Sequence, residues 1–543
     1  MKIKILYELF KKYYIIVLIS IISFLISFLI YFNFNQSKID KSLIVLPFLN
    51  LQNNFKSNYF SDGITEDLIA KLSTIQELNV ISREVSLQYE DTKKPFEEIA
   101  RKHELSNILT GEIIEKKDSI FIKCEFKNIY LDKINWKKEF FGLKNDIPEI
   151  QSKLIKQIVG SLNVKLNLSE RKIINASHFK NFDSYNYYLK GNFEFNKRTF
   201  QNYDISINYY NKALQLDPFN SKIYSLISNS YAEMYNLNKH EIYKDLAISA
   251  SERAIKINSK YPGGYLSRAN ILTILGHLNE AYRFNIKASE INSLVGGNEN
   301  NALIAQWRGD LSEALNWYKK IPKKDVHHES KALVELSNIY YLLGKKEKAI
   351  DLMDFGLKNQ PNSFYYNRFF VIHESFVKNK DNAKKYIYRL QRLRPNDSRV
   401  NSITGLYYLW FRDYNKSLSY FQKVKYPWFE DKIAIAFILR QKWGKKWSNT
   451  ILKEVLDECK KRIESGDEMS LTRYYISMVF SIQEDIEKAF IWLEKSVDEG
   501  FLWTDYLEID PRFDILRNDK RFNSILQKIN LKLKDENNEI DFF

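Results

Sequence analysis

Apolar residues recur at helical spacing on both sides of Gly344, at Leu333, Leu336 and Tyr340 before it and at Ala349, Met353 and Leu357 after it. This pattern predicts two amphipathic helices joined by a tight turn. Pro361 ends the second helix, because proline has no amide proton and cannot continue an α-helix. A single helical hairpin cannot bury both of its apolar faces, so the pattern also predicts neighbouring copies.

Copies of this hairpin recur upstream and downstream in one frame. The repeated positions are Tyr210, Ala213, Pro218, Tyr224, Ser228, Tyr231, Ala254, Ser259, Tyr265, Ala269, Leu272, Gly276, Ala281, Ala288, Ala302, Gly309, Ala314, Tyr318, Ala383, Leu390, Pro395, Gly405, Tyr408, Phe421, Phe480, Ala489, Leu493 and Val497. A single copy is a weak match, but about eight copies predict an all-α solenoid. Their size and layout resemble the tetratricopeptide repeat, and we place the array at residues 184–500.

The N-terminus carries a different pattern. Residues 1–12 contain four lysines and one acidic residue, and residues 13–33 are uncharged and almost entirely apolar. About 20 helical residues span roughly 30 Å, so the pattern predicts a transmembrane helix at 13–33 after a basic cytoplasmic tail. A cleaved signal peptide is the alternative, but no small-residue cleavage site follows. The lysines would leave the bulk of the chain in the periplasm of a bacterium, anchored in the inner membrane.

Three serines, Ser20, Ser23 and Ser27, share one face of this predicted helix. Small and hydroxylated residues allow close packing of membrane helices, so a homodimer through this face is a possible assembly. Serines on lipid-facing helices are also common, which leaves this interpretation open.

Between residues 41 and 168, short apolar runs alternate with amphipathic segments. Runs at 43–48, 79–82, 108–114, 120–126 and 136–141 predict strands, and segments at 64–72, 95–103 and 150–166 predict helices. We expect Asp62 to cap the first helix, with Glu66 and Asp67 in its first turn. A metal or acid–base site at these three residues would need further ligands from elsewhere. The region is therefore predicted to be a small α/β domain.

Three segments of this region carry a second resemblance: 42–48 (SLIVLPF), 59–69 (YFSDGITEDLI) and 109–112 (LTGE). They are similar to the TolB-like domain of membrane-anchored bacterial regulators, a family that commonly joins this domain to tetratricopeptide repeats. The segment 510–519 (DPRFDILRND), followed by Phe522, resembles the closing motif of such proteins, within a C-terminal segment at 501–543. The resemblance is to the sensor half of CadC-like and cyclase-associated regulators. About a dozen residues precede the predicted anchor here, which disfavours direct transcriptional or cyclase output.

Composition changes this picture little. The net charge is +15, but 67 acidic residues are interspersed with 82 basic ones, so we expect no nucleic-acid partner. Lys442 to Lys446 with Trp443 and Trp447 is the most basic aromatic stretch, and we interpret the tryptophans as anchors of the repeat core. The two cysteines, Cys124 and Cys459, predict no disulfide framework or zinc site. The pair His327–His328 is interpreted as part of a solvated loop.

No motif for catalysis, a metal or a cofactor is found, so we predict a protein that is not an enzyme. Gly296–Gly297, for example, lacks the Lys-Ser/Thr of a phosphate-binding loop. The candidate binding residues are Asn229, Asn270 and Asn338, which follow the small residue of three first helices. An asparagine can donate to and accept from a peptide backbone at once. The alternative is that all three are simply solvated.

These observations predict a membrane-anchored periplasmic scaffold that binds a protein or peptide in the groove of the array. Leu303 replaces asparagine in the intervening copy, so a bound peptide would meet polar contacts at both ends and an apolar contact between them. The alternative function is a signalling subunit that relays an envelope stimulus to a separate cytosolic effector.

Overall fold

A computed structural model describes residues 41–541, apart from 52–57, 91, 93, 104, 130, 177–178, 293–296 and 321–329. The predicted basic tail, the predicted transmembrane helix at 13–33 with its serine face, and His327–His328 lie outside the described residues. Within the part of the chain that is described, no helix is both long enough and apolar enough to cross a bilayer. This finding corrects the predicted localisation as a single-pass inner-membrane protein.

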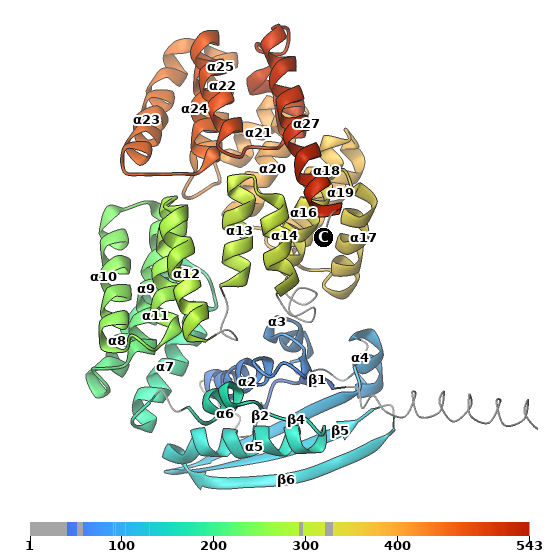
Figure 1. Ribbon diagram of the computed structural model, residues 1–543, viewed down its shortest axis with the longest axis vertical. Helices are drawn as coiled ribbons and strands as arrows, with labels where there is room; N and C mark the ends of the chain where they lie inside the picture. The colour runs from blue at the N-terminus through green and yellow to red at the C-terminus, as the bar shows by residue number, and fades with distance from the viewer. Residues whose placement is uncertain are drawn as a thin grey trace, which may run out of the picture.

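An α/β domain forms one end of the molecule, and a curved array of helices forms the rest (Figure 1). The sheet order is β3-β1-β4-β5-β6, and β2 pairs with β4. β1 runs parallel to β3 and β4, whereas β4, β5 and β6 form an antiparallel meander. The strands are β1 (Ser42–Val45), β2 (Leu49–Asn50), β3 (Asn79–Val80), β4 (Asn107–Lys116), β5 (Ser119–Asn128) and β6 (Lys133–Leu143).

Helices cover both faces of this sheet. The larger core lies on the side of α2 (Asn58–Ser73) and α5 (Ile147–Ser161), where Leu43, Val45 and Ile122 are buried. The smaller core lies on the side of α3 (Arg83–Ser86) and α4 (Phe96–His103), where Ile44 and Ile108 are buried. Adjacent strand residues therefore point into different cores, as the alternation of a β-strand requires. The predicted α/β domain is confirmed.

The predicted cap at Asp62 is wrong. Helix α2 already begins at Asn58, so Asp62 lies inside it and Glu66 and Asp67 lie near its middle. The Ser61 carbonyl accepts a hydrogen bond from Thr65 Oγ1 within the helix. Ser, Asp and Gly are weak helix formers, and packing against the next domain overrides this local preference.

The array consists of antiparallel helical hairpins, as predicted, and most join a first helix to a second helix through a short turn. Helix α6 (Leu168–Asn175) connects it to the α/β domain. The first hairpins are α7 (Phe182–Phe195) with α8 (Phe200–Leu216), α9 (Ser221–Asn238) with α10 (Glu241–Ile257), α11 (Pro262–Leu275) with α12 (Leu278–Ile291), and α13 (Asn298–Arg308) with α14 (Leu311–Lys320). Those that follow are α16 (Ser330–Leu342) with α17 (Lys346–Asn359), α18 (Phe364–Phe376) with α19 (Lys380–Leu393), α20 (Ser398–Trp410) with α21 (Tyr414–Phe421), α22 (Phe429–Trp443) with α23 (Lys445–Glu464), and α24 (Ser470–Gln483) with α25 (Ile486–Asp498).

The small residues of the repeat pattern hold each hairpin together. Ser337 Oγ donates to the Ala349 carbonyl at 2.6 Å, and Ser477 Oγ makes the same bond to Ala489 at 2.7 Å. Ser228 reaches the Ala247 carbonyl at 2.7 Å in the hairpin of the longer helices α9 and α10. Such a bond forms only where the two helix backbones approach closely, so Ser and Ala at these positions are a packing requirement.

The array curves until late repeats lie against early ones. Gly309, after α13, and Gly500, after α25, meet backbone to backbone, and both have positive φ (+85° and +108°). The Glu468 amide donates to the Gly276 carbonyl at 2.9 Å, and Asn279 binds the Glu468 carboxylate. We call this contact between early and late repeats the seam. Beyond it, α26 (Thr504–Ile509), η3 (Pro511–Phe513) and α27 (Lys520–Asp541) complete the chain.

Candidate functional site

The first helices α9 and α11 pack side by side, as do the successive first helices from α13 to α24, and we call the surface formed by the first helices the inner face. Asn229 on α9 and Asn270 on α11 are in direct contact there, since Asn270 Nδ2 donates to Asn229 Oδ1 at 3.3 Å. Both side chains are half-buried. The structure therefore brings two of the three predicted binding residues together. Each keeps hydrogen-bonding capacity after this single bond, because a carboxamide offers two donors and two lone pairs.

Asn338 lies in a different environment on α16. Its Nδ2 donates to Glu335 Oε2 at 3.2 Å, and its Oδ1 lies 3.3 Å from His373 Nε2. Gln306 Nε2 also donates to Glu335 Oε2 at 3.2 Å, so the chain of bonds crosses α13, α16 and α18. Burial lowers the pKa of His373 to about 3, so the imidazole is neutral and its Nε2–H donates to Asn338. Both polar ends of Asn338 are thus engaged within the protein.

The chain's own C-terminal segment covers the inner face beyond Asn338. Trp503 stacks on Tyr341 of α16 with ring centroids 6.4 Å apart, and the Tyr341 hydroxyl donates to Asp505 Oδ1 at 3.3 Å. Tyr506 lies edge-on against Phe376 of α18 at 4.8 Å and contacts Trp410 of α20 at 5.9 Å. A peptide spanning all three asparagines, as the sequence predicted, would therefore meet this segment in its path.

A buried ion pair fixes that segment. Arg512 binds both carboxylate oxygens of Asp510, at 2.8 and 2.6 Å, and its Nη1 donates to the Glu430 carbonyl of α22 at 3.2 Å. Ser481 Oγ of α24 donates to the Arg512 carbonyl at 2.7 Å. Asp510 and Arg512 are 0% and 1% exposed. The closing motif identified in the sequence is therefore an internal tie between α22, α24 and the C-terminal segment.

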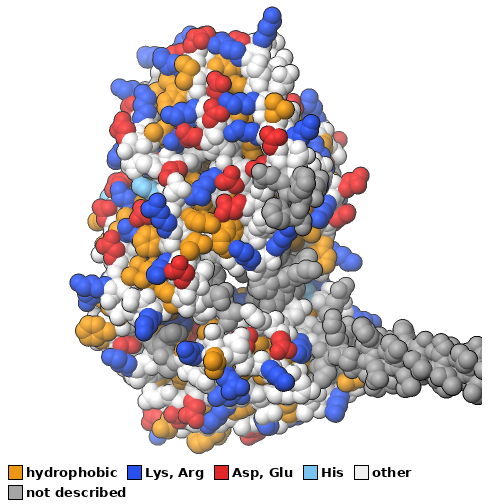
Figure 2. Space-filling model, in the orientation of Figure 1, with side chains coloured by type: hydrophobic (Ala, Val, Ile, Leu, Met, Phe, Trp, Pro, Cys, Tyr) orange, Lys and Arg blue, Asp and Glu red, His pale blue; other side chains and the backbone are white. Residues whose placement is uncertain are grey.

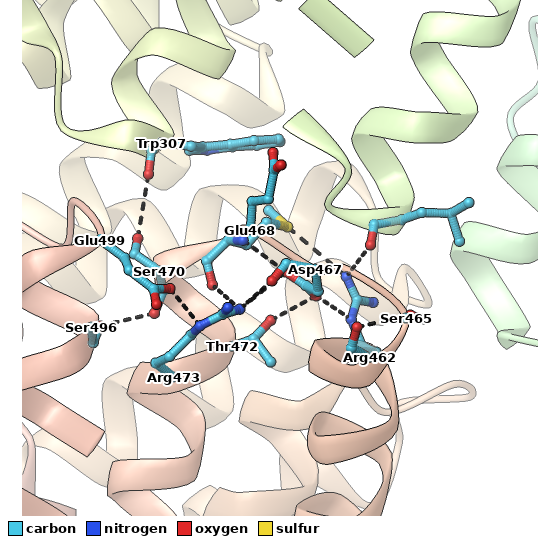
Figure 3. A network of polar contacts seen from close by, with 12 residues as sticks. Trp307, Arg462, Ser465, Asp467, Glu468, Ser470, Thr472, Arg473, Ser496 and Glu499 are labelled. Carbon is cyan, nitrogen blue, oxygen red and sulfur yellow. Dashed lines mark hydrogen bonds and ion pairs between the residues drawn. The ribbon is translucent and has the colours of Figure 1, made fainter. Parts of the chain in front are cut away.

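A second ion cluster holds the seam, and Figure 3 shows Arg462 and Arg473 converging on Asp467. Arg462 Nε lies 2.6 Å from Asp467 Oδ2, and Thr472 Oγ1 donates to the same oxygen at 2.9 Å. The side chain of Asp467 is fully buried. Ser470 Oγ reaches the Trp307 carbonyl of α13 at 3.4 Å, so the cluster joins the late repeats to the early ones.

The acidic residues of α2 face the start of the array. Asp67 accepts hydrogen bonds from the Tyr185 and Tyr188 hydroxyls of α7 at 2.7 and 3.0 Å. Glu66 accepts from Asn196 Nδ2 at 3.2 Å and pairs with Arg83 at 2.9 Å. These contacts tie the α/β domain to the first hairpin. The sequence could not predict this role, because residues about 120 positions apart take part in it.

Burial, with the nearby charge of Glu90, raises the pKa of Asp62 from 3.8 to about 6, although Arg83 opposes the shift. The pKa of Glu66 is raised in the same direction, again chiefly by burial. Two lysines complete the charged groups near Glu66 and Asp67, namely Lys71 of α2 itself and Lys222 of α9 in the array. A raised carboxyl pKa means that the folded state loses stability as pH rises from about 4 through 6.

We expect Asp62→Asn to remove this pH dependence. The variant should be more stable than the parent by about 1–2 kcal/mol at pH 7, and the difference should shrink towards pH 4, where the parent carboxyl is protonated in the folded state and about half protonated in the unfolded state. Urea-unfolding midpoints measured between pH 4 and pH 8 give the difference curve. A stability difference that is independent of pH would contradict the assignment.

The described residues hold no group of three His, Cys, Asp or Glu side chains that could bind a metal. Both cysteines are buried, and burial raises the pKa of Cys124 to about 12 and also raises that of Cys459. Neither thiol is therefore an activated nucleophile. The interpretation of Trp443 and Trp447 as core anchors is wrong, because they are 54% and 60% exposed.

Comparison with known proteins gives partial likenesses. No family model matches the chain. The Rhizobium meliloti (strain 1021) protein named "Putative adenylate cyclase 3" is 30% identical over 131 residues, which are 24% of this chain and 22% of that protein. The chain thus matches about a fifth of that relative's length.

Two solved structures are similar to parts of the chain at a low level. PilF of Pseudomonas aeruginosa is 16% identical with a TM-score of 0.31, over 42% of this chain and 97% of that one. A human IFIT1 dimer with PPP-AAAA is 12% identical with a TM-score of 0.37, over 64% and 77%. These scores are too low to carry an argument, so the class rests on the geometry above. The chain is a solenoid of antiparallel helical hairpins preceded by a small α/β domain.

Proposed function

We propose that this protein is a non-enzymatic scaffold that binds a peptide segment of a partner protein on the inner face at α9 and α11. The observation that carries the proposal is the Asn229–Asn270 pair, which is half-buried and bonded side chain to side chain on adjacent first helices. Paired carboxamides match the alternating donors and acceptors of an extended backbone. The N-terminal domain is proposed to be TolB-like, on the segments quoted above.

The third asparagine, Asn338, is not proposed to contact the ligand, because it binds residues of the protein itself. Asn338 holds Glu335 and His373 beneath the C-terminal segment, which places the far end of the accessible inner face before α16. A ligand would therefore extend from α9 towards α13 and end there. Leu303 of α13 is buried, at 8% exposure, so the apolar contact that the sequence predicted at this residue is not open to a ligand.

The double variant Asn229→Ala/Asn270→Ala should weaken partner binding at least about fivefold, because each lost neutral hydrogen bond costs about 0.5–1.5 kcal/mol. Benzoylphenylalanine introduced at Leu266, one turn before Asn270, should crosslink the partner in intact cells, and the double variant should diminish that adduct. The same photoreactive residue at Phe219, which is 66% exposed, should not form it. An undiminished adduct in a folded double variant would refute the proposal.

Asn338→Ala supplies a contrast within the same protein. This change leaves Glu335 and His373 without their shared partner, so it should lower stability by about 1–3 kcal/mol rather than weaken binding selectively. Thermal unfolding and the crosslinking yield, measured side by side, separate the two effects. Binding lost at Asn338 with unchanged stability would mean that the binding face extends under the C-terminal segment.

A regulatory function is the second proposal, and the likeness to a segment of an adenylate cyclase favours it. In this form, the array would pass its ligand state to a separate cyclase or other effector protein. Co-purification of such an effector with the full chain, and a change of its activity when Asn229 and Asn270 are replaced, would support this form. An effector whose activity is unaffected by the double variant would leave only the scaffold function.

A further inference from the structure

Trp443 and Trp447 form an exposed aromatic pair at the turn between α22 and α23. Every residue from 441 to 447 is exposed, which is unusual for a turn that contains two tryptophans. The two rings contact each other, with centroids 6.0 Å apart and planes inclined by 57°. Helices α22 and α23, which the turn joins, lie at the end of the molecule opposite the α/β domain, beyond α9 and α11 (Figure 1).

A glycine creates this arrangement. Gly444 has φ +90° and ψ 179°, a conformation that side-chain-bearing residues rarely adopt. Gly444 ends α22 and lets α23 start in a new direction. The side chain of Trp443, at the end of α22, then contacts that of Trp447, in the first turn of α23. A Cβ at this position would meet no atom within 4 Å, so the glycine serves the backbone conformation and not packing.

Lys442, Lys445 and Lys446 flank the two tryptophans along the chain, and Lys442 Nζ lies 5.3 Å from the centroid of the Trp443 ring. Lys445 and Arg440 both bind the Glu484 carboxylate, at 3.0 and 2.8 Å, and Lys442 donates to Asn415 Oδ1. Lys445 and Arg440 lower the pKa of Glu484, so the Glu484 carboxylate stays ionised. Lys446 forms no ion pair with any described residue. The Arg440 side chain is only 8% exposed, so the exposed lysines Lys442, Lys445 and Lys446 supply the positive rim around the apolar centre.

This geometry selects among ligand classes. The tryptophan rings touch each other, so no nucleobase can insert between them, although ring-to-base stacking is the usual basis of single-strand binding. A lipid surface attracts lysines through a diffuse field, which needs no ordering of individual cations. Cations fixed by Glu484 and Asn415 instead suit discrete carboxylates at defined positions. Exposed tryptophans beside a charged rim are also the composition of protein-interaction hot spots.

We propose that Trp443, Trp447 and the surrounding cations form a docking surface for an acidic segment of a partner protein, with an apolar side chain seated on the tryptophans and flanking carboxylates on the lysines. Elsewhere, on the face shown in Figure 2, basic and acidic side chains are interspersed, so no broad positive field competes for such a segment there. This surface does not depend on the inner-face site. A scaffold with both would hold two partners at separate places.

The test uses the full chain labelled with 5-fluorotryptophan and observed by fluorine NMR. The chain has nine tryptophans, and Trp443→Phe and Trp447→Phe assign the two relevant resonances. The probe is a synthetic peptide in which Asp and Glu flank a Leu-Phe pair. Its titration should shift these two resonances in a saturable manner and leave the other seven unchanged. A peptide with Lys in place of Asp and Glu should shift neither.

A matched pair of variants tests the role of the lysines. Lys445→Gln/Lys446→Gln should weaken binding of the acidic peptide at least about fivefold. Lys453→Gln/Lys460→Gln removes the same charge from exposed positions of the same helix and should change binding less than twofold. Equal weakening in both variants would reduce the effect to net charge and overturn the proposal. Shifts of the same two resonances by oligothymidine or phosphatidylglycerol vesicles, but not by the acidic peptide, would also overturn it.

Discussion

Replacement of Arg512 by alanine should lower the stability of the array by about 3–5 kcal/mol, the usual cost of removing one partner from a buried ion pair. The change leaves the Asp510 carboxylate, which is 0% exposed, without the bidentate contact that neutralises it. It also removes the contact to the Glu430 carbonyl. The C-terminal segment should then detach from α22, and urea unfolding should begin at lower denaturant than in the parent.

The chain contains a matched control for this experiment. Asp519 and Arg521 form the same fork two residues apart, with Arg521 Nη2 at 2.8 Å from Asp519 Oδ2, but the Arg521 side chain is 43% exposed. Exposed ion pairs contribute about 0–1 kcal/mol, so Arg521→Ala should shift the unfolding midpoint little. Hydrogen exchange at 501–513 should rise in the Arg512 variant alone. Equal effects of the two changes would mean that burial of the fork is unimportant.

Local sequence patterns predicted the helical hairpins and the strands, because packing between residues that are close in the sequence determines both. The Ser and Ala positions of the repeats follow from the close approach of two helices within one hairpin, so Ser337 and Ala349 are recognisable twelve residues apart. The strands of the α/β domain were predicted for the same reason, since a short apolar run indicates a strand buried on both faces and alternation indicates a strand buried on one face. The contact between Asn229 and Asn270 also follows from a repeat position, because adjacent first helices present equivalent residues to each other.

Such local patterns could not predict contacts between segments that are far apart in the sequence. Nothing near Asn338 in the sequence indicates that Trp503 and Asp505 lie over the same part of the inner face. Asp505, which binds Tyr341, is 164 residues away from it in the sequence. Asp62 resembled a helix cap because Asp-Gly is a common start signal, whereas contacts with α7 stabilise four further residues at the start of α2. Trp443 and Trp447 resembled core residues because tryptophan is usually buried, and only the backbone at Gly444 turns them outward.

Gly500→Ala should open the seam, the contact between early and late repeats. A Cβ at Gly500 would lie 2.2 Å from the Arg308 carbonyl carbon and 2.6 Å from the Gly309 amide nitrogen, both of them backbone atoms that cannot rotate away. The φ of +108° is also unfavourable for alanine. Overpacking of about 1–3 kcal/mol adds to backbone strain of about 1–2 kcal/mol, so the loop after α13 should separate from the loop after α25. Hydrogen exchange at Glu468, whose amide binds the Gly276 carbonyl, should then increase.

Gly344→Ala separates these two contributions. Gly344 also has positive φ (+75°), but a Cβ there would meet no atom within 4 Å. This variant should therefore lose only the strain of about 1–2 kcal/mol and keep the protection of Glu468, because the turn after α16 takes no part in the seam. Small-angle scattering should report a larger radius of gyration for Gly500→Ala and an unchanged one for Gly344→Ala. If both variants lose the same stability and retain the same shape, the close approach of Gly309 and Gly500 does not hold the early and late repeats together.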